Sequence, residues 1–150
     1  MVIGSDSEGI RKEIQSLPVR IAMNEVPESD MAESVRTGFK MIDSTSTGIL
    51  ICLSDHPMVS TETLKKLIDK HTEDPDKILV PCYNLKRGHP ALFPKLVLKD
   101  ISEGLNLREI IKGNLQKMLY MDVSDEGVVL DLDTMEDYKE ILKRQSDFVR

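Results

Sequence analysis

Apolar positions along this chain fall into two patterns that alternate from one end to the other. Short apolar runs, typical of buried strands, occur at residues 1–4, 19–24, 48–54, 77–83, 117–123 and 127–132. Other segments repeat an apolar residue every three or four positions, as helices with one buried face do. The pattern therefore predicts a chain in which strands and helices alternate.

Five helices are predicted, and several have recognisable ends. The first helix stops at Pro18, and Ser60 is placed to cap the third. Thr134 and Asp137 have capping-box spacing at the start of the last helix. Four of the helices are defined by apolar triplets, which are Ile10, Ile14 and Leu17; Val35, Phe39 and Ile42; Leu64, Leu67 and Ile68; and Tyr138, Ile141 and Leu142. The fifth is a short helix within residues 106–114 that Gly113 closes.

This alternation predicts an α/β fold with a mostly parallel sheet and helices on both faces. Residues 48–54 are expected to form the central strand, and Asp55, His56 and Pro57 follow this run directly. Ligands bind such sheets beyond the carboxyl ends of the strands. An acid at this place is either part of a ligand site or an ordinary turn at the end of a strand.

Composition narrows the function. The chain has 40% hydrophobic and 31% charged residues, as a single soluble globular domain does. A net charge of −6 argues against nucleic-acid and anionic-membrane partners, and no run approaches the ~20 apolar residues of a membrane span. Cys52 and Cys82 lack metal-ligand spacing, and we expect them to pack as small hydrophobic residues in a reducing compartment, which favours a cytoplasmic location.

Four segments resemble one known family. They are "MAESVRTGF" at 31–39, "GILICLSDHPMVSTETLKKLI" at 48–68, "VPCYNLKRGHPALF" at 80–93 and "LDLDTMEDY" at 130–138. Their order and spacing are similar to those of the molybdenum cofactor cytidylyltransferase group of MobA-like nucleotidyltransferases, over essentially the whole chain. The resemblance implies a three-layer Rossmann-like nucleotide-diphospho-sugar transferase fold.

The resemblance also implies a reaction. A terminal phosphate of the acceptor attacks the α-phosphorus of CTP, or of another NTP, and pyrophosphate leaves, with Mg2+ as cofactor. The acceptor is molybdopterin carrying molybdenum, and a molybdoenzyme that receives the finished cofactor is a further partner. Such chemistry depends on positioning and charge neutralisation and needs no protein nucleophile. The sequence shows no recognisable nucleophilic triad, which agrees with this mechanism.

One segment of the family pattern has no counterpart in residues 1–150. The family begins with a strand and a glycine-rich loop that wraps the triphosphate. Here residues 2–14 match the family's second strand and helix instead. We therefore expect a domain over 1–150 that lacks the first strand, corresponds to the C-terminal two-thirds to three-quarters of the enzyme, and has little activity by itself. The alternatives are a non-catalytic binding module of the same fold and a related transferase with another phosphorylated acceptor.

The resemblance assigns roles to residues at the strand ends. Asp55 is expected to be the catalytic residue that holds Mg2+, because Mg2+ prefers hard carboxylate oxygens. His56 is a poor ligand for Mg2+ and is expected to line the pocket or bind a phosphate. The segment at 86–90 either binds the anionic acceptor or is a solvated loop; its residues are Lys86, Arg87, Gly88, His89 and Pro90.

Two further groups of residues are expected to contact the metal or the nucleotide. Asp131 and Asp133 alternate along an expected strand, so both would point to the face that carries the metal; alternatively, Asp133 only provides negative charge at the start of the last helix. Asn24, Ser34 and Arg36 are expected, with Asp55, to contact the nucleotide; otherwise Ser34 and Arg36 belong to an exposed helical turn.

Overall fold

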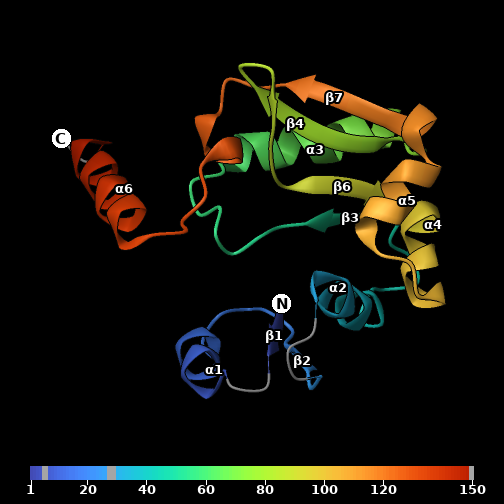
Figure 1. Ribbon diagram of the computed structural model, residues 1–150, viewed down its shortest axis with the longest axis horizontal. Coiled ribbons are helices and arrows are strands. Elements are labelled where there is room, and N and C mark those ends of the chain that lie inside the picture. The colour runs from blue at the N-terminus through green and yellow to red at the C-terminus, as the bar shows by residue number, and fades with distance from the viewer. Residues whose placement is uncertain (5–6, 27–29, 149–150) are drawn as a thin grey trace. The chain divides into compact units, whose positions relative to one another are not determined.

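A computed structural model describes residues 1–4, 7–26 and 30–148 (Figure 1). The chain divides into two compact units. Unit 1 consists of residues 1–47 and 95–115, and unit 2 of residues 48–94 and 116–150.

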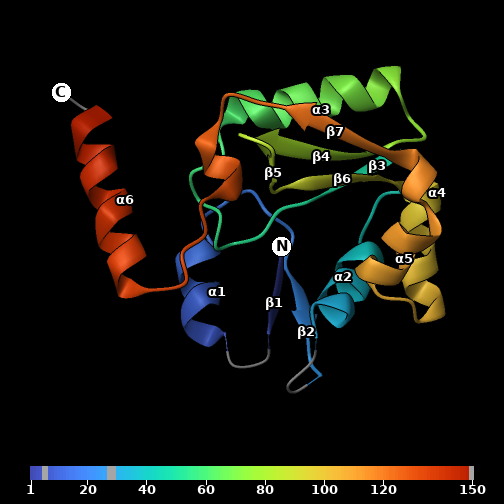
Figure 2. The same ribbon diagram turned by 45° about the horizontal axis from the view of Figure 1, so that its top comes forward.

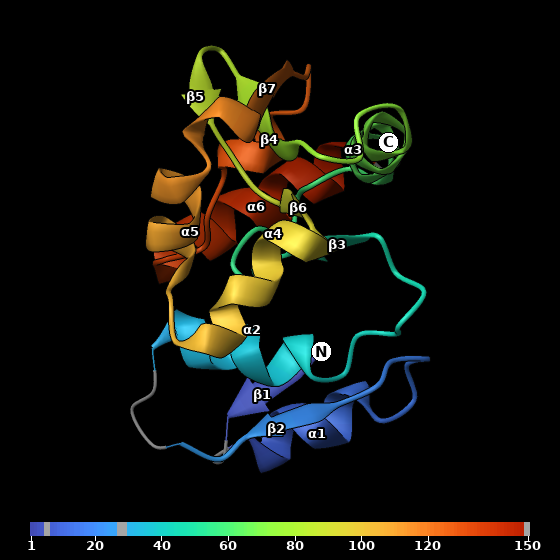
Figure 3. The same cartoon turned by 90° about the vertical axis from the view of Figure 1, so that its right-hand side faces the viewer.

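Unit 1 is built on a pair of short parallel strands. These are β1 (Val2–Gly4) and β2 (Ala22–Asn24), which lie side by side (Figures 2 and 3). The helical elements of the unit are α1 (Glu8–Ile14), α2 (Met31–Phe39), α4 (Lys95–Leu98), the 3-10 helix η1 (Lys99–Glu103) and α5 (Leu107–Gly113). Asp30 caps α2 by accepting a hydrogen bond from the Glu33 amide at 2.9 Å.

Unit 2 contains a five-stranded mixed sheet. Its strands are β3 (Gly48–Ile51), β4 (Ile78–Tyr83), β5 (Lys86–Arg87), β6 (Ala91–Pro94) and β7 (Met118–Asp122). β6 pairs antiparallel with both β3 and β4, β5 forms a hairpin with β4, and β7 runs parallel to β4. The helical elements are α3 (Thr61–Glu73), η3 (Glu126–Val129) and α6 (Met135–Phe148), with η2 (Leu115–Lys117) at the junction with unit 1.

The core of unit 2 lies between α3 and one face of the sheet (Figure 1). Leu67 of α3 packs against Leu79 of β4 and Leu92 of β6, and none of the three is more than 3% exposed. Ser60 caps α3 by accepting a hydrogen bond from the Thr63 amide at 3.2 Å, as predicted. None of the described helices is long and apolar enough to span a membrane.

The α/β class and most elements are confirmed, but the sheet is not mostly parallel as predicted. Only β1–β2 and β4–β7 are parallel pairs, whereas β3–β6, β4–β5 and β4–β6 are antiparallel. The connections from β4 to β5 and from β5 to β6 are too short for the crossover that a parallel pair needs.

Three predictions of local structure are also wrong. Residues 127–132 form no strand: residues 127–129 belong to η3 and residues 130–132 follow it as a loop, because the Asp125 side chain accepts from the Gly127 amide and closes a turn there. β3 is not central in the sheet, because β6 lies between it and β4. Cys52 is exposed, whereas Cys82 is buried as expected.

Several helix faces are also less buried than predicted. Ile141 of α6 is 7% exposed, but Tyr138 and Leu142 are nearly half exposed. Leu67 is fully buried, whereas its neighbour Ile68 is 52% exposed. Helix α1 has no buried residue. Periodicity therefore located the helices better than it identified the side chains that they bury.

Candidate functional site

The first part of the site is the loop after β3, residues 53–60, which we call the DHP loop. Its first turn is closed by a 3.4 Å hydrogen bond from the His56 amide to the Leu53 carbonyl. Within it, Asp55 Oδ1 lies 2.9 Å from His56 Nδ1. This hydrogen bond holds the pKa of Asp55 below its usual value. The Asp55 side chain is 44% exposed and that of His56 only 10%, so an ionised carboxylate faces solvent beside a covered imidazole.

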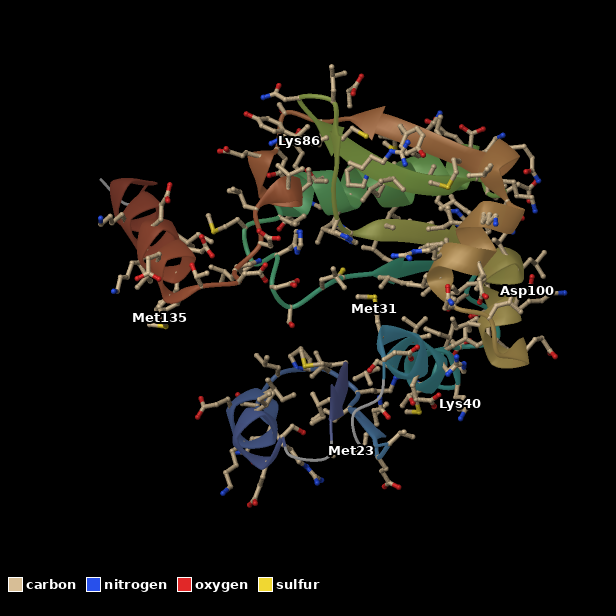
Figure 4. The ribbon with its side chains drawn as sticks, in the orientation of Figure 1. Met23, Met31, Lys40, Lys86, Asp100 and Met135 are labelled. Carbon is tan, nitrogen blue, oxygen red and sulfur yellow. The ribbon has the colours of Figure 1, made fainter. Side chains whose placement is uncertain are left out.

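The second part is the loop at residues 84–90, which we call the basic loop. Asn84 and Leu85 turn the chain from β4 into β5 with φ angles of 48° and 66°. Two positive φ angles in succession are typical of a type I′ hairpin turn. Lys86 follows the turn as an exposed side chain (Figure 4), and the Arg87 guanidinium lies 4.5 Å from the centre of the Tyr120 ring.

The two loops meet at a pair of histidines. The rings of His56 and His89 are 5.0 Å apart between centroids and lie edge to face. His89 Nδ1 is buried and has no hydrogen-bond partner among the described residues. Burial, and then the proximity of His56, lower the pKa of His89. The structure therefore brings Asp55, His56 and His89 into one cluster, in which burial favours the neutral form of His89.

A third segment, residues 125–132, which we call the strap, connects the two loops. The His89 amide donates to the Val128 carbonyl at 2.8 Å, and the Leu132 amide donates to the Asp55 carbonyl at 2.8 Å. Sequence analysis missed this segment, because it was interpreted as a strand. The signal that could have revealed it is an aspartate two residues before a glycine, which is typical of a side-chain-closed turn.

The strap also explains the glycine of the basic loop. A Cβ atom added at Gly88 would lie 2.3 Å from the Val128 carbonyl oxygen, so the close approach that Gly88 permits is that of the strap. The Gly88 amide donates to the Pro81 carbonyl at 2.8 Å. Pro90 is buried and follows a cis peptide bond. Gly88 and Pro90 thus shape the loop, while Lys86, Arg87 and His89 carry its basic side chains.

Residues 131–133 form no strand, so the prediction that Asp131 and Asp133 lie on one face of a strand is wrong. Both side chains are exposed, and Asp131 lines a hollow of about 70 Å3 together with Asp137 and Glu140. Among the described residues, no three His, Cys, Asp or Glu side chains lie close enough to hold a metal ion together. A metal at Asp55 would therefore need oxygens from the substrate or water.

Unit 1 contains the remaining predicted residues. Asn24 is buried at the end of β2, and its side-chain amide donates to Ser34 Oγ at 3.1 Å. Arg36 donates from Nε to the Ile101 carbonyl at 2.9 Å and forms an ion pair with Glu33. Asn24 and Ser34 are thus brought together, whereas Arg36 already has structural partners on two sides.

The described strands and helices define an α/β protein in which two loops bring Asp55, His56 and His89 together. The family model of the MobA-like NTP transferase domain matches residues 1–119, and the chain belongs to this family of nucleotidyltransferases. No curated protein sequence matches the chain.

Three solved structures show the same fold. A homologue of Mycobacterium tuberculosis Rv0371c from Mycobacterium sp. strain JC1 matches with a TM-score of 0.80 and 20% identity, over 98% of this chain and 74% of that one. Rv0371c from M. tuberculosis in complex with manganese matches with a TM-score of 0.72 and 24% identity, over 95% and 76%. The 4-diphosphocytidyl-2C-methyl-D-erythritol synthase from Anaerococcus prevotii matches with a TM-score of 0.72 and 17% identity, over 99% and 80%.

Proposed function

We propose that this domain transfers CMP from CTP to molybdopterin carrying molybdenum, with release of pyrophosphate. The observation that supports the proposal best is the cluster at the strand ends, where Asp55, His56 and His89 come together from two separate loops. Family membership supports the reaction class. The choice of CTP and of the pterin acceptor rests on the resemblance of the motifs at 48–68 and 80–93.

Asp55 is the residue proposed to hold Mg2+. Its carboxylate is ionised, half-exposed and placed after the end of β3, and one oxygen is engaged by His56. Mg2+ commonly binds one or two carboxylates and completes its shell with water and substrate phosphates, so a single acid fits this requirement. When bound, the metal would neutralise charge on the phosphates. Asp131 and Asp133 stay weaker proposals for the same role.

The basic loop is proposed to bind the phosphate of the acceptor. Lys86 offers an exposed ammonium group, and His89 offers an imidazole whose Nδ1 lacks a protein partner among the described residues. Arg87 is held over Tyr120 and would act from a fixed position. These groups bind and orient an anion without forming a covalent bond to it. Asn24 and Ser34 are proposed contacts of the nucleotide, with Arg36 the weakest of the three.

The test is a pyrophosphate-release assay with molybdenum cofactor and each of CTP, GTP, ATP and UTP, with and without Mg2+. We expect slow release that depends on CTP and Mg2+, and its loss in Asp55→Asn, since asparagine keeps the size but removes the negative ligand. Asp76→Asn, an exposed acid in another turn of unit 2, is the matched control and should behave as the wild type. Equal activity of Asp55→Asn and the wild type would contradict the proposed role of Asp55.

A binding module of the same fold is the second candidate. Such a module would keep the groups proposed to bind the acceptor, Lys86 and His89, without catalysing the transfer. Isothermal titration of CTP and of molybdenum cofactor, alongside the release assay, separates the two candidates. Binding of the cofactor without pyrophosphate release would favour the module, whereas release with CTP would favour the enzyme.

A further inference from the structure

We propose that Asp125 is a positioning residue that holds the DHP loop and the basic loop together through the strap. The inference rests on the proposed function, because these two loops carry the residues proposed to bind metal and acceptor. Asp125 is not itself part of the cluster of Asp55, His56 and His89. Its proposed role is to fix the distance between them.

The Asp125 carboxylate accepts three hydrogen bonds from two segments. Oδ2 accepts from the Ser60 amide at 2.9 Å and from Thr63 Oγ1 at 2.6 Å, where the DHP loop enters α3. Oδ1 accepts from the Gly127 amide at 2.9 Å, at the start of the strap. Burial opposes ionisation of this group, but the hydrogen bonds from Thr63 and Ser60 outweigh it and lower the pKa of Asp125. One ionised group therefore joins the end of one loop to the strap.

Backbone contacts connect the strap to both loops. At Gly127, an added Cβ would lie 2.2 Å from the Met58 carbonyl oxygen, so the strap is pressed against the DHP loop. Val128 is fully buried and accepts the His89 amide, and Leu132 donates to the Asp55 carbonyl. A shift of the strap would thus move the backbones of Asp55 and His89 together.

Asp125→Asn would disrupt these hydrogen bonds while it keeps the size and shape of the side chain. All three partners are donors, and they face both oxygens of the carboxylate. Whichever way an amide is turned, its NH2 group faces at least one donor, so at least one hydrogen bond is lost. Misplacement of reacting groups by about 1 Å can reduce turnover by about 100-fold. We expect the strap to loosen and the two loops to lose their alignment, with no loss of the residues proposed to bind substrate.

The experiment compares Asp125→Asn with the wild type and with Ile78→Val, a buried core variant of β4 that lies outside the strap and the two loops in the sequence. Histidine side-chain NMR signals provide the first measurement, because the chain has three histidines and His71 lies away from the strap on α3. We expect the signals of His56 and His89 to move in Asp125→Asn while that of His71 stays. In Ile78→Val, the signals of His56 and His89 should stay.

Turnover provides the second measurement. We expect kcat to fall by about 10- to 100-fold in Asp125→Asn, with a smaller change in KM for CTP, and to stay near the wild-type value in Ile78→Val. Thr63→Val, which removes one of the three hydrogen bonds and keeps the charge, should give an intermediate loss and replaces Asp125→Asn if that variant does not fold. Unmoved signals of His56 and His89, or an unchanged kcat, would overturn the positioning role. Absence of turnover in the wild type would contradict the proposed function instead, and the histidine signals would then decide on Asp125.

Discussion

The contact between Gly88 and the strap makes a quantitative prediction for Gly88→Ala. The added methyl group would lie 2.3 Å from the Val128 carbonyl oxygen and 2.7 Å from its carbonyl carbon. An ordinary carbon–oxygen contact is about 3.3 Å, so one backbone segment must move by about 1 Å. Both atoms belong to the backbone, and Val128 is fully buried, so no side-chain rotation relieves the clash.

The expected cost follows from two contributions. Overpacking of a well-packed site costs about 1–3 kcal/mol. Displacement of Val128 also weakens the hydrogen bond from the His89 amide, which contributes about 0.5–1.5 kcal/mol. We therefore expect Gly88→Ala to lower the free energy of unfolding of unit 2 by about 2–4 kcal/mol. With an m-value of about 2 kcal/mol/M, the urea midpoint should fall by about 1–2 M.

Tyrosine fluorescence during urea unfolding measures this change selectively. All three tyrosines (Tyr83, Tyr120 and Tyr138) lie in unit 2, and the chain has no tryptophan. Gly113→Ala is the control, because an added Cβ there has no neighbour within 4 Å and the residue belongs to unit 1. Its tyrosine midpoint should equal that of the wild type. A Gly88→Ala midpoint within about 0.2 M of the wild type would refute the tight contact between the strap and the basic loop.

Two other perturbations test the loops. Leu85→Gly should raise the free energy of unfolding by about 0.5–1 kcal/mol in the same assay. Leu85 is 95% exposed and has a φ of 66°, a conformation that costs about 1–2 kcal/mol in residues other than glycine, and the greater entropy of glycine in the unfolded state offsets part of the gain. An unchanged midpoint would argue against strain in this turn. The lowered pKa of Asp125 predicts that its stabilising contribution is full above the ordinary aspartate value of 3.8 and is lost as pH falls through the lower folded-state pKa. The stability difference between the wild type and Asp125→Asn should therefore be larger at pH 6 than near pH 3, and a difference independent of pH would contradict this assignment.

Features that depend on neighbours in the sequence could be predicted. The Ser60 cap of α3 and the contact of Thr134 with Asp137 both occur as their spacing indicated, because each involves residues only three positions apart. The turn at Asp55 could be placed for a similar reason, since a polar residue that directly follows an apolar run marks the end of a strand. These signals located one half of the site.

Features that depend on distant segments could not be predicted from spacing. Residues 128–130 are apolar and suit a buried strand, but periodicity cannot distinguish a strand from other buried backbone over so short a run. Here Val128 is buried because it packs against Gly88, 40 positions earlier in the chain. The insertion of β6 between β3 and β4 is likewise a matter of long-range pairing.

Gly88 shows how a contact between distant segments shapes the site. A glycine between basic residues suggests a backbone that a ligand approaches closely. In the structure, the space beside Gly88 is filled by the Val128 carbonyl, and the equivalent space beside Gly127 by the Met58 carbonyl. Both glycines therefore serve contacts within the protein that hold the two loops in place. Under this proposal, Asp55, His56 and His89 owe their alignment to a segment that carries none of the three, which is why a search for acids, bases and histidines alone finds the cluster but not its support.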